Sequence, residues 1–93
     1  MPVAVEMNFK GATLEQYDQV IELMGLQSGQ APPNALFHWV AKTDDGIRVV
    51  DVWETKEAYE HFAHDQIAPY TQQAGFEGPP EVTYYDVHNV IKA

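Results

Sequence analysis

The sequence predicts an α+β protein whose elements follow the order βαββαβ, and three observations indicate this order. The stretch from Ala35 to Glu54 places two apolar runs of strand length on either side of the turn sequence Thr43-Asp44-Asp45-Gly46, which is typical of a β-hairpin. One segment with helical periodicity precedes this hairpin and another follows it. Alternating or β-branched runs near the two ends of the chain supply two further strands.

The first strand and the first helix have clear boundaries. Residues 3–9 alternate in polarity and place four apolar side chains on one face: Val3, Val5, Met7 and Phe9. Thr13 and Gln16 form a T-x-x-Q capping box, which predicts that a helix starts directly after Thr13. Gly25 is the expected C′ glycine of this helix. The apolar stripe of the helix consists of Leu14, Tyr17, Val20, Ile21 and Met24.

A long loop, a second helix and a last strand complete the chain. Glycine and two prolines make residues 26–34 irregular, so we expect a surface loop there, or a flap over a pocket. Thr55 caps the second helix, and Pro69 predicts a break near residues 65–68, followed by a short helical piece through Gln73. The run of β-branched and aromatic residues from Glu81 to Ile91 is the predicted last strand.

This order of elements is the split βαβ, or ferredoxin-like, arrangement. It predicts a four-stranded antiparallel sheet with both helices on one face. The hairpin, however, is apolar on both faces, and leaving one of them in water would cost several kcal/mol at about 25 cal/mol per Å². We therefore predict a symmetric homodimer with packed sheets. The two faces carry Phe37, Trp39, Val50 and Val52 on one parity, and Leu36, Val40, Val49 and Trp53 on the other.

Length and charge narrow the class of protein. Ninety-three residues make one domain, residues 1–93. The net charge of −9 argues against nucleic acid and anionic membranes as partners. No run approaches the roughly 20 apolar residues that span a bilayer. The absence of cysteine is compatible with a reducing compartment, and we expect the protein to be cytoplasmic.

Two polar residues, His38 and Asp51, lie inside the otherwise apolar strands of the hairpin. If the turn has two residues, these side chains lie opposite each other, within reach of a carboxylate–imidazole hydrogen bond. Such a bond would hold one imidazole tautomer, which suits a general base. If Gly46 forms a bulge instead, the register slips by one residue and the two side chains lie on opposite faces. The pair is therefore either a catalytic or binding dyad, or a structural ion pair in the core or at a dimer interface.

Other polar residues have both a functional and a structural interpretation. His88, on the predicted last strand, either joins the His38 site or caps the sheet edge. Tyr59 and Tyr70 can offer phenols to a ligand, or pack in the core with their hydroxyls satisfied. The H-x-x-H-D sequence of residues 61–65 has helical spacing suited to a metal, but a site needs three or four ligands, so we predict no metal site.

The chain resembles the dimeric α/β-barrel superfamily. The segments that carry the resemblance are Phe37–Val40, Asp45–Thr55, Glu57–Tyr59 with Phe62, and Val87–Val90. Within the superfamily they are similar to small proteins of the antibiotic-biosynthesis monooxygenase (ABM) group. The resemblance implies a homodimer whose sheets form a barrel, with a ligand cavity between each sheet and its own helices.

The resemblance also argues against one branch of the superfamily. The haem-degrading enzymes use an Asn on the first strand, and a Trp and a His in the second helix. Asn8 matches the first position, but Phe62 falls at the Trp position, and Thr71 or Gln72 falls near the His position. We therefore do not expect haem degradation.

The leading functional hypothesis is a homodimer that binds a hydrophobic, aromatic small molecule and oxygenates it without a metal or organic cofactor. His38, assisted by Asp51, would take a proton from a phenol or an activated carbon. The residues expected to contact the substrate are Trp53, Phe62 and Tyr59 as walls of the cavity, and Tyr70, Asn8 and His88 as orienting groups.

Two alternatives stay open at the level of sequence: a non-catalytic dimeric binding or structural module, and a polyketide-type cyclase or isomerase that uses the same His. The size and lining of the cavity distinguish an enzyme from a non-catalytic module. A sizeable pocket that contains His38 and a tyrosine favours chemistry, whereas a filled core with His38 at the dimer interface favours the module.

Overall fold

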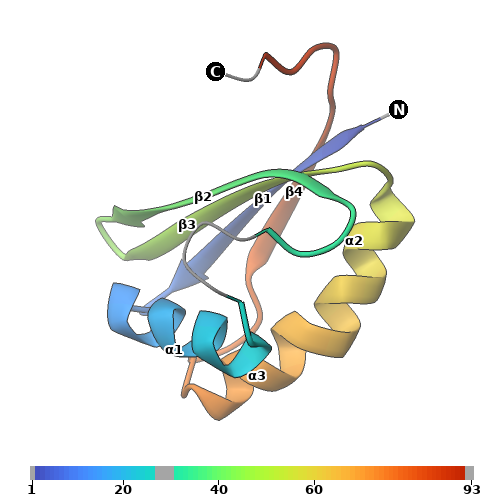
Figure 1. Cartoon of the computed structure of the whole chain (residues 1–93). Helices are drawn as coiled ribbons and strands as arrows, with labels where there is room; N and C mark the ends of the chain where they lie inside the picture. Colours follow the sequence, from blue (N-terminus) through green and yellow to red (C-terminus); the bar gives the residue numbers. More distant parts are fainter. Residues whose placement is uncertain (1, 27–30, 92–93) are drawn as a thin grey trace.

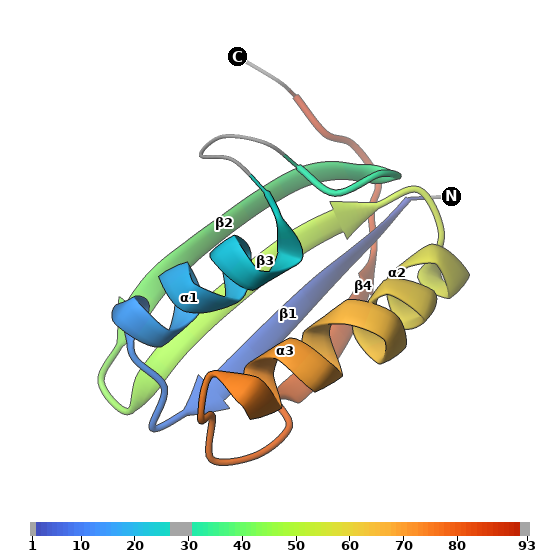
Figure 2. The same ribbon diagram turned by 60° about the horizontal axis from the view of Figure 1, so that its bottom comes forward.

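The computed structural model describes residues 2–26 and 31–91. A four-stranded antiparallel sheet, in the order β2-β3-β1-β4, carries all the helices on one face (Figures 1 and 2). This confirms the predicted βαββαβ order. The elements are β1 (Val3–Lys10), α1 (Leu14–Met24), β2 (Ala35–Thr43), β3 (Gly46–Trp53), α2 (Lys56–Phe62), the π-helix η1 (Ala63–Ile67), α3 (Ala68–Gln73) and β4 (Glu81–Asp86).

The hydrophobic core lies between the sheet and the helices. The alternation of β1 predicted this, because every second side chain of a strand faces the same layer. β3 runs beside β1 with Val5 opposite Asp51, so a carboxylate sits in the middle of the apolar face. On this face, the buried apolar side chains of the two central strands are Val3, Val5, Met7, Phe9, Ile47, Val49 and Trp53.

The hairpin has the register that brings the predicted dyad together. Asp44 and Asp45 form a two-residue turn, and Thr43 pairs with Gly46. His38 therefore lies directly opposite Asp51. The alternative with a bulge at Gly46 is excluded, because the irregularity of β2 lies at its other end, near Ala35.

The helix ends agree with the sequence, and the break predicted near residues 65–68 takes the form of the π-helix η1, followed by the predicted short helix through Gln73. Thr13 and Gln16 form the reciprocal capping box, and Gly25 has the left-handed conformation, with φ of 77°. From Lys56 to Gln73 the chain stays helical, as Figure 2 shows. The wider π-helical turn before Pro69 accommodates the proline, with the backbone N–H of Ala68 bonded to the carbonyl of Ala63.

The last strand is shorter than predicted. β4 ends at Asp86, because that residue pairs with Val3, the first residue of β1. One further bond joins the N–H of Val87 to the carbonyl of Pro2, and within residues 2–26 and 31–91 no strand pairing extends β4 beyond it. His88 thus lies outside the sheet and is exposed, which corrects its predicted place on the strand. Residues 27–30 of the predicted loop or flap lie outside the described residues.

The face of the sheet away from the helices is apolar over part of its area. Phe37 and Trp39 of β2 are 47% and 41% exposed, and Tyr85 of β4 is 50% exposed. Val52 and Ala4 lie between Phe37 and Tyr85 in the pairing of the strands. Considering only the described residues, no helix is long and apolar enough to cross a membrane.

Candidate functional site

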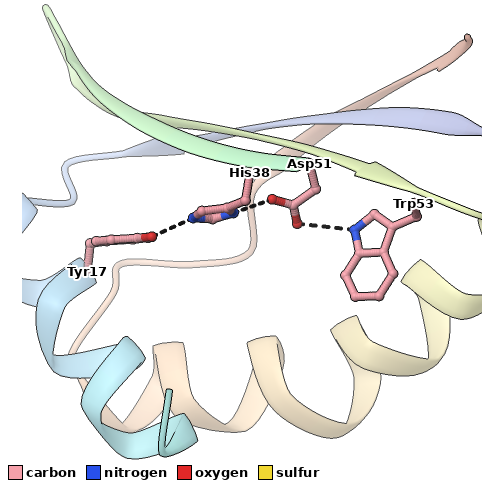
Figure 3. Close-up of polar contacts among 4 residues, drawn as sticks. All are labelled: Tyr17, His38, Asp51 and Trp53. Atoms are coloured by element: carbon pink, nitrogen blue, oxygen red, sulfur yellow. Dashed lines mark hydrogen bonds and ion pairs between the residues drawn. The ribbon is translucent and has the colours of Figure 1, made fainter. Parts of the chain in front are cut away.

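Four polar side chains form a continuous chain of hydrogen bonds between α1 and the sheet (Figure 3). The Tyr17 hydroxyl lies 2.5 Å from Nε2 of His38. Nδ1 of His38 bonds to Oδ1 of Asp51, and the indole Nε1 of Trp53 donates to Oδ2 of the same carboxylate at 3.2 Å. The chain therefore joins α1, β2 and β3 through side chains alone.

Local strand geometry explains why the His and Asp meet. His38 and Asp51 are cross-strand partners whose side chains point to the same face of the sheet. Asp51 is 3% exposed. A buried carboxylate is costly unless hydrogen-bonded, and here both of its oxygens have a donor.

The donors around Asp51 determine the tautomer of His38. An indole N–H is only a donor, so the carboxylate accepts from Trp53. The second oxygen of the carboxylate accepts from Nδ1–H of His38, which leaves Nε2 of the neutral ring as an acceptor. The Tyr17 hydroxyl must then donate to Nε2. This arrangement leaves His38 with a basic nitrogen directed at a phenol.

Tyr17 stays protonated over the whole range of neutral pH. Burial, and to a smaller extent the nearby Asp51 and Asp18 carboxylates, raise its pKa from 10.0 to about 12. The planes of the Tyr17 and His38 rings differ by only 13°. The two rings are therefore nearly parallel where the hydroxyl meets Nε2.

A cavity of about 670 Å³ opens beside this chain of hydrogen bonds, between the sheet and the helices. Its volume falls within the range typical of small-molecule sites. The His38 side chain is 28% exposed, so its ring is reachable from the cavity. Asp18 and Glu22 are acidic residues on its wall, and none of the described residues that line it is Lys or Arg. The other lining side chains include Met7, Phe9, Ile21, Met24, Leu36, Ile47, Val49, Phe62, Ile67, Thr71 and Phe76.

Of the three aromatic residues predicted to form walls of the cavity, one lines it and two do not. Phe62 lines the cavity as expected. Trp53 and Tyr59 are buried and pack in the core beside it, with ring centroids 5.1 Å apart for Trp53 and Phe62 and 6.1 Å for Trp53 and Tyr59. Burial raises the pKa of Tyr59, and the neighbouring Tyr84 adds to the increase. Trp53 thus contacts the site through Asp51, and Tyr70 is not among the residues that line the cavity.

The structure does not bring Asn8 or His88 to the cavity. Asn8 lies on the opposite face of the sheet, where its side chain donates to Glu6 at 3.0 Å and accepts from Arg48 at 2.8 Å. The even parity of Asn8 in β1 determines this, because the odd residues face the helices. His88 lies beyond the end of β4, as described above.

The H-x-x-H-D sequence forms a small exposed cluster on the helical layer. His61 and His64 each lie 3.0 Å from a different oxygen of Asp65. The hydrogen bond from His64 lowers the pKa of Asp65. Within residues 2–26 and 31–91, no group of three such side chains has a geometry that could hold a metal ion.

Tyr17 is the site residue that the sequence interpretation missed. The helical periodicity places it only in the apolar stripe of the first helix. A usable signal was present, since a tyrosine on the buried side of a helix needs a partner for its hydroxyl. His38, on the sheet face beneath this helix, is that partner.

No protein-family model and no curated relative matches this sequence. Solved structures do share its fold over nearly the whole chain. Rv0793 from Mycobacterium tuberculosis is 17% identical, with a TM-score of 0.65, over 99% of this chain and 100% of that one. A candidate antibiotic biosynthesis monooxygenase from Chloroflexus aurantiacus J-10-fl is 18% identical, with a TM-score of 0.62, over 99% and 98%.

A third structure contains a ligand. It is a monooxygenase from the gene ActVA-Orf6 of Streptomyces coelicolor in complex with nanaomycin D. It is 24% identical, with a TM-score of 0.51, and the match covers 99% of this chain and 91% of that one. The chain described here therefore has the ferredoxin-like fold of the antibiotic biosynthesis monooxygenase domain proteins.

Proposed function

We propose that this protein binds a flat, hydrophobic phenol in the cavity between its sheet and helices and oxygenates it without a metal or organic cofactor. His38 is the general base, and Asp51 orients it. The observation that supports this most directly is the hydrogen-bonded Tyr17–His38–Asp51 chain on the wall of a cavity of about 670 Å³. A pocket that contains both an imidazole and a tyrosine favours chemistry over a purely structural role.

Dioxygen is the oxidant in the proposed reaction. Transfer of the phenol proton to Nε2 of His38 leaves an electron-rich phenolate that can reduce dioxygen. One oxygen atom enters the ring to form a quinone, and the other leaves as water, so the substrate supplies all four electrons. The imidazolium formed at His38 is stabilised by the Asp51 carboxylate, as in other His–Asp pairs.

We also propose that the protein is a homodimer packed through the open face of the sheet. Support comes from Phe37, Trp39 and Tyr85, three large apolar side chains that stay 41–50% exposed on one face. Such a patch on a small protein is a common mark of an interface. The prediction of a second copy from the two-sided hairpin also used Phe37 and Trp39, together with Val50 and Val52.

The proposed activity is tested by oxygen uptake with 1-naphthol as the probe substrate. We expect the wild-type protein to consume one dioxygen per naphthoquinone formed, with one atom of labelled dioxygen in the product. His38→Ala should lower the rate by about 100-fold or more, the usual contribution of a positioned base. Asp51→Asn should lower it as well, because an amide cannot accept hydrogen bonds at both of its ends.

Asp44→Asn is the matched control for the loss of a carboxylate, because Asp44 lies in the exposed hairpin turn. Circular dichroism should show the same fold for all the variants. If naphthol is bound and rearranged without oxygen uptake, the cyclase or isomerase alternative holds instead. Binding without any turnover across a panel of phenols would support the non-catalytic module and contradict the proposal.

A further inference from the structure

The Tyr17 hydroxyl is hydrogen-bonded to Nε2 of His38, the nitrogen that accepts the proton in the proposed reaction. A neutral imidazole has one acceptor nitrogen, and in this structure the Tyr17 hydroxyl already donates to it. A substrate phenol therefore cannot reach Nε2 of His38 unless Tyr17 changes its hydrogen-bond partner.

We propose that the substrate hydroxyl inserts between Tyr17 and His38, so that its oxygen accepts a hydrogen bond from Tyr17 while its proton passes to Nε2 of His38. This inference rests on the proposed role of His38 as the base. Tyr17 then becomes a specificity-determining residue: the site recognises one oxygen through a donor and an acceptor. The class of ligand is a neutral phenol or enol on a flat apolar body.

The charges around the cavity favour this ligand over a preformed anion. Asp18 and Glu22 line the cavity, and no Lys or Arg is present among its described lining residues. A carboxylate or phosphate ester would enter against these charges without a cationic partner. A neutral hydroxyl meets no such barrier and acquires its charge only at the site, where the protonated His38 balances it.

The proton transfer is balanced within the site. The O–H bond of the phenol breaks, an N–H bond forms at Nε2 of His38, and Asp51 keeps its charge. The phenolate oxygen then accepts hydrogen bonds from the Tyr17 hydroxyl and from the new N–H. Tyr17 remains a neutral donor throughout, since its raised pKa disfavours a tyrosinate beside Asp51 and Asp18. Tyr17 thus stabilises the charge that the reaction creates.

The test measures the pKa of a bound phenol whose ionised form absorbs visible light, 4-nitro-1-naphthol. We expect the wild-type protein to lower the titration midpoint of the naphthol below its value in water. Tyr17→Phe should keep the ring that packs beside His38 but return the midpoint toward water by about one pH unit, a tenfold weaker preference for the phenolate. His38→Gln should also abolish the lowered midpoint.

Tyr85→Phe, which removes a phenol hydroxyl from the open face of the sheet, is the matched control and should behave as wild type. An unchanged midpoint in Tyr17→Phe, or tighter naphthol binding by that variant, would mean that Tyr17 only competes with the ligand and would overturn the inference. A wild-type midpoint equal to that in water would overturn it as well.

Nitrogen NMR of the wild-type protein gives a second readout that needs no variant. Saturation with the naphthol should convert Nε2 of His38 from an acceptor to a protonated nitrogen, and a spectrum that stays unchanged would contradict the inference. Failure of the proposed oxygenation is distinguishable from failure of this inference. A protein that lowers the naphthol midpoint through Tyr17 but consumes no oxygen would contradict the oxygenation alone.

Discussion

At the scale of single residues, the site depends on how each polar atom is partnered. Asp51 lies on a face otherwise made of apolar side chains, and its two oxygens accept from His38 and Trp53. Loss of one of these donors would leave a buried oxygen without a partner and would lower the free energy of unfolding by about 1–3 kcal/mol. His38 in turn directs its remaining nitrogen at Tyr17. The environment of each residue is therefore set by the next one along the hydrogen-bonded chain.

Tyr17 makes the stability of the protein fall at high pH. Its pKa is about 12 in the folded protein against 10.0 ordinarily, so between these values the unfolded chain releases a proton that the folded protein retains. The unfolded state then binds fewer protons, and the free energy of unfolding decreases as the pH rises from 10 to 12. We expect Tyr17→Phe to make this decline shallower, as measured by urea unfolding at several pH values.

The decline should persist in part in Tyr17→Phe, because burial raises the pKa of Tyr59 in the same direction. Tyr85→Phe serves again as the control for removing a hydroxyl. An identical decline in wild type and Tyr17→Phe would show that the Tyr17 phenol titrates alike in the folded and unfolded chains.

At the scale of elements, the cavity is bounded by the sheet, by α1 and by the helical layer formed by α2, η1 and α3. Gln16 connects the two parts. Its side chain accepts from the backbone N–H of Thr13 at 3.0 Å and donates to the carbonyls of Ala74 and Gly75 at 3.3 and 3.2 Å. One side chain thus closes the start of α1 and binds it to the end of α3. Because Tyr17 follows Gln16, this link also holds the phenol in place.

Gln16→Ala removes half of the capping box and both bonds to the end of α3. We expect the free energy of unfolding to fall by about 1–2 kcal/mol, since capping interactions and hydrogen bonds each contribute about 1 kcal/mol. Chemical denaturation measures this change. Gln19→Ala, an exposed position on the same helix, should shift the midpoint much less. Equal shifts in the two variants would assign the effect to helix propensity alone.

At the scale of the whole molecule, the two faces of the sheet have different roles. All the helices lie on one face of the sheet (Figure 1). That face and its helices enclose the core and the cavity, and the other face carries a patch of exposed aromatic residues. The hydrogen-bonded group of Glu6, Asn8 and Arg48 lies on the same open face. An apolar patch beside a polar group resembles the usual composition of an interface.

Trp39→Glu tests whether this face joins two copies. A carboxylate placed opposite its counterpart in a symmetric interface is buried and repelled, so we expect sedimentation velocity to show a dimer for wild type and a monomer for the variant. Leu14→Glu, which adds the same charge to the exposed side of α1, should stay dimeric. A wild-type protein that sediments as a monomer at micromolar concentration would remove the homodimer from the proposal.

Local patterns allowed much of this molecule to be predicted. Three features depend on residues close together in the chain: the strand alternation, the capping box of α1 and the β-hairpin. Their geometry therefore follows from short-range sterics and hydrogen bonding. The pairing of His38 with Asp51 belongs to the same class, once the turn is limited to two residues. Two of the four residues in the hydrogen-bonded chain, His38 and Asp51, could therefore be predicted to meet from the hairpin alone.

The sequence by itself determined the order of the elements, the apolar faces and the residues available for a base and its partner. Only the tertiary structure decided that Tyr17, 21 positions before His38, donates to it, because that contact depends on how α1 packs across the sheet. The same holds for the end of β4, which stops where β1 offers no further partner. In each case the deciding contact joins segments far apart in the chain, and the periodicity of a single segment does not predict such contacts.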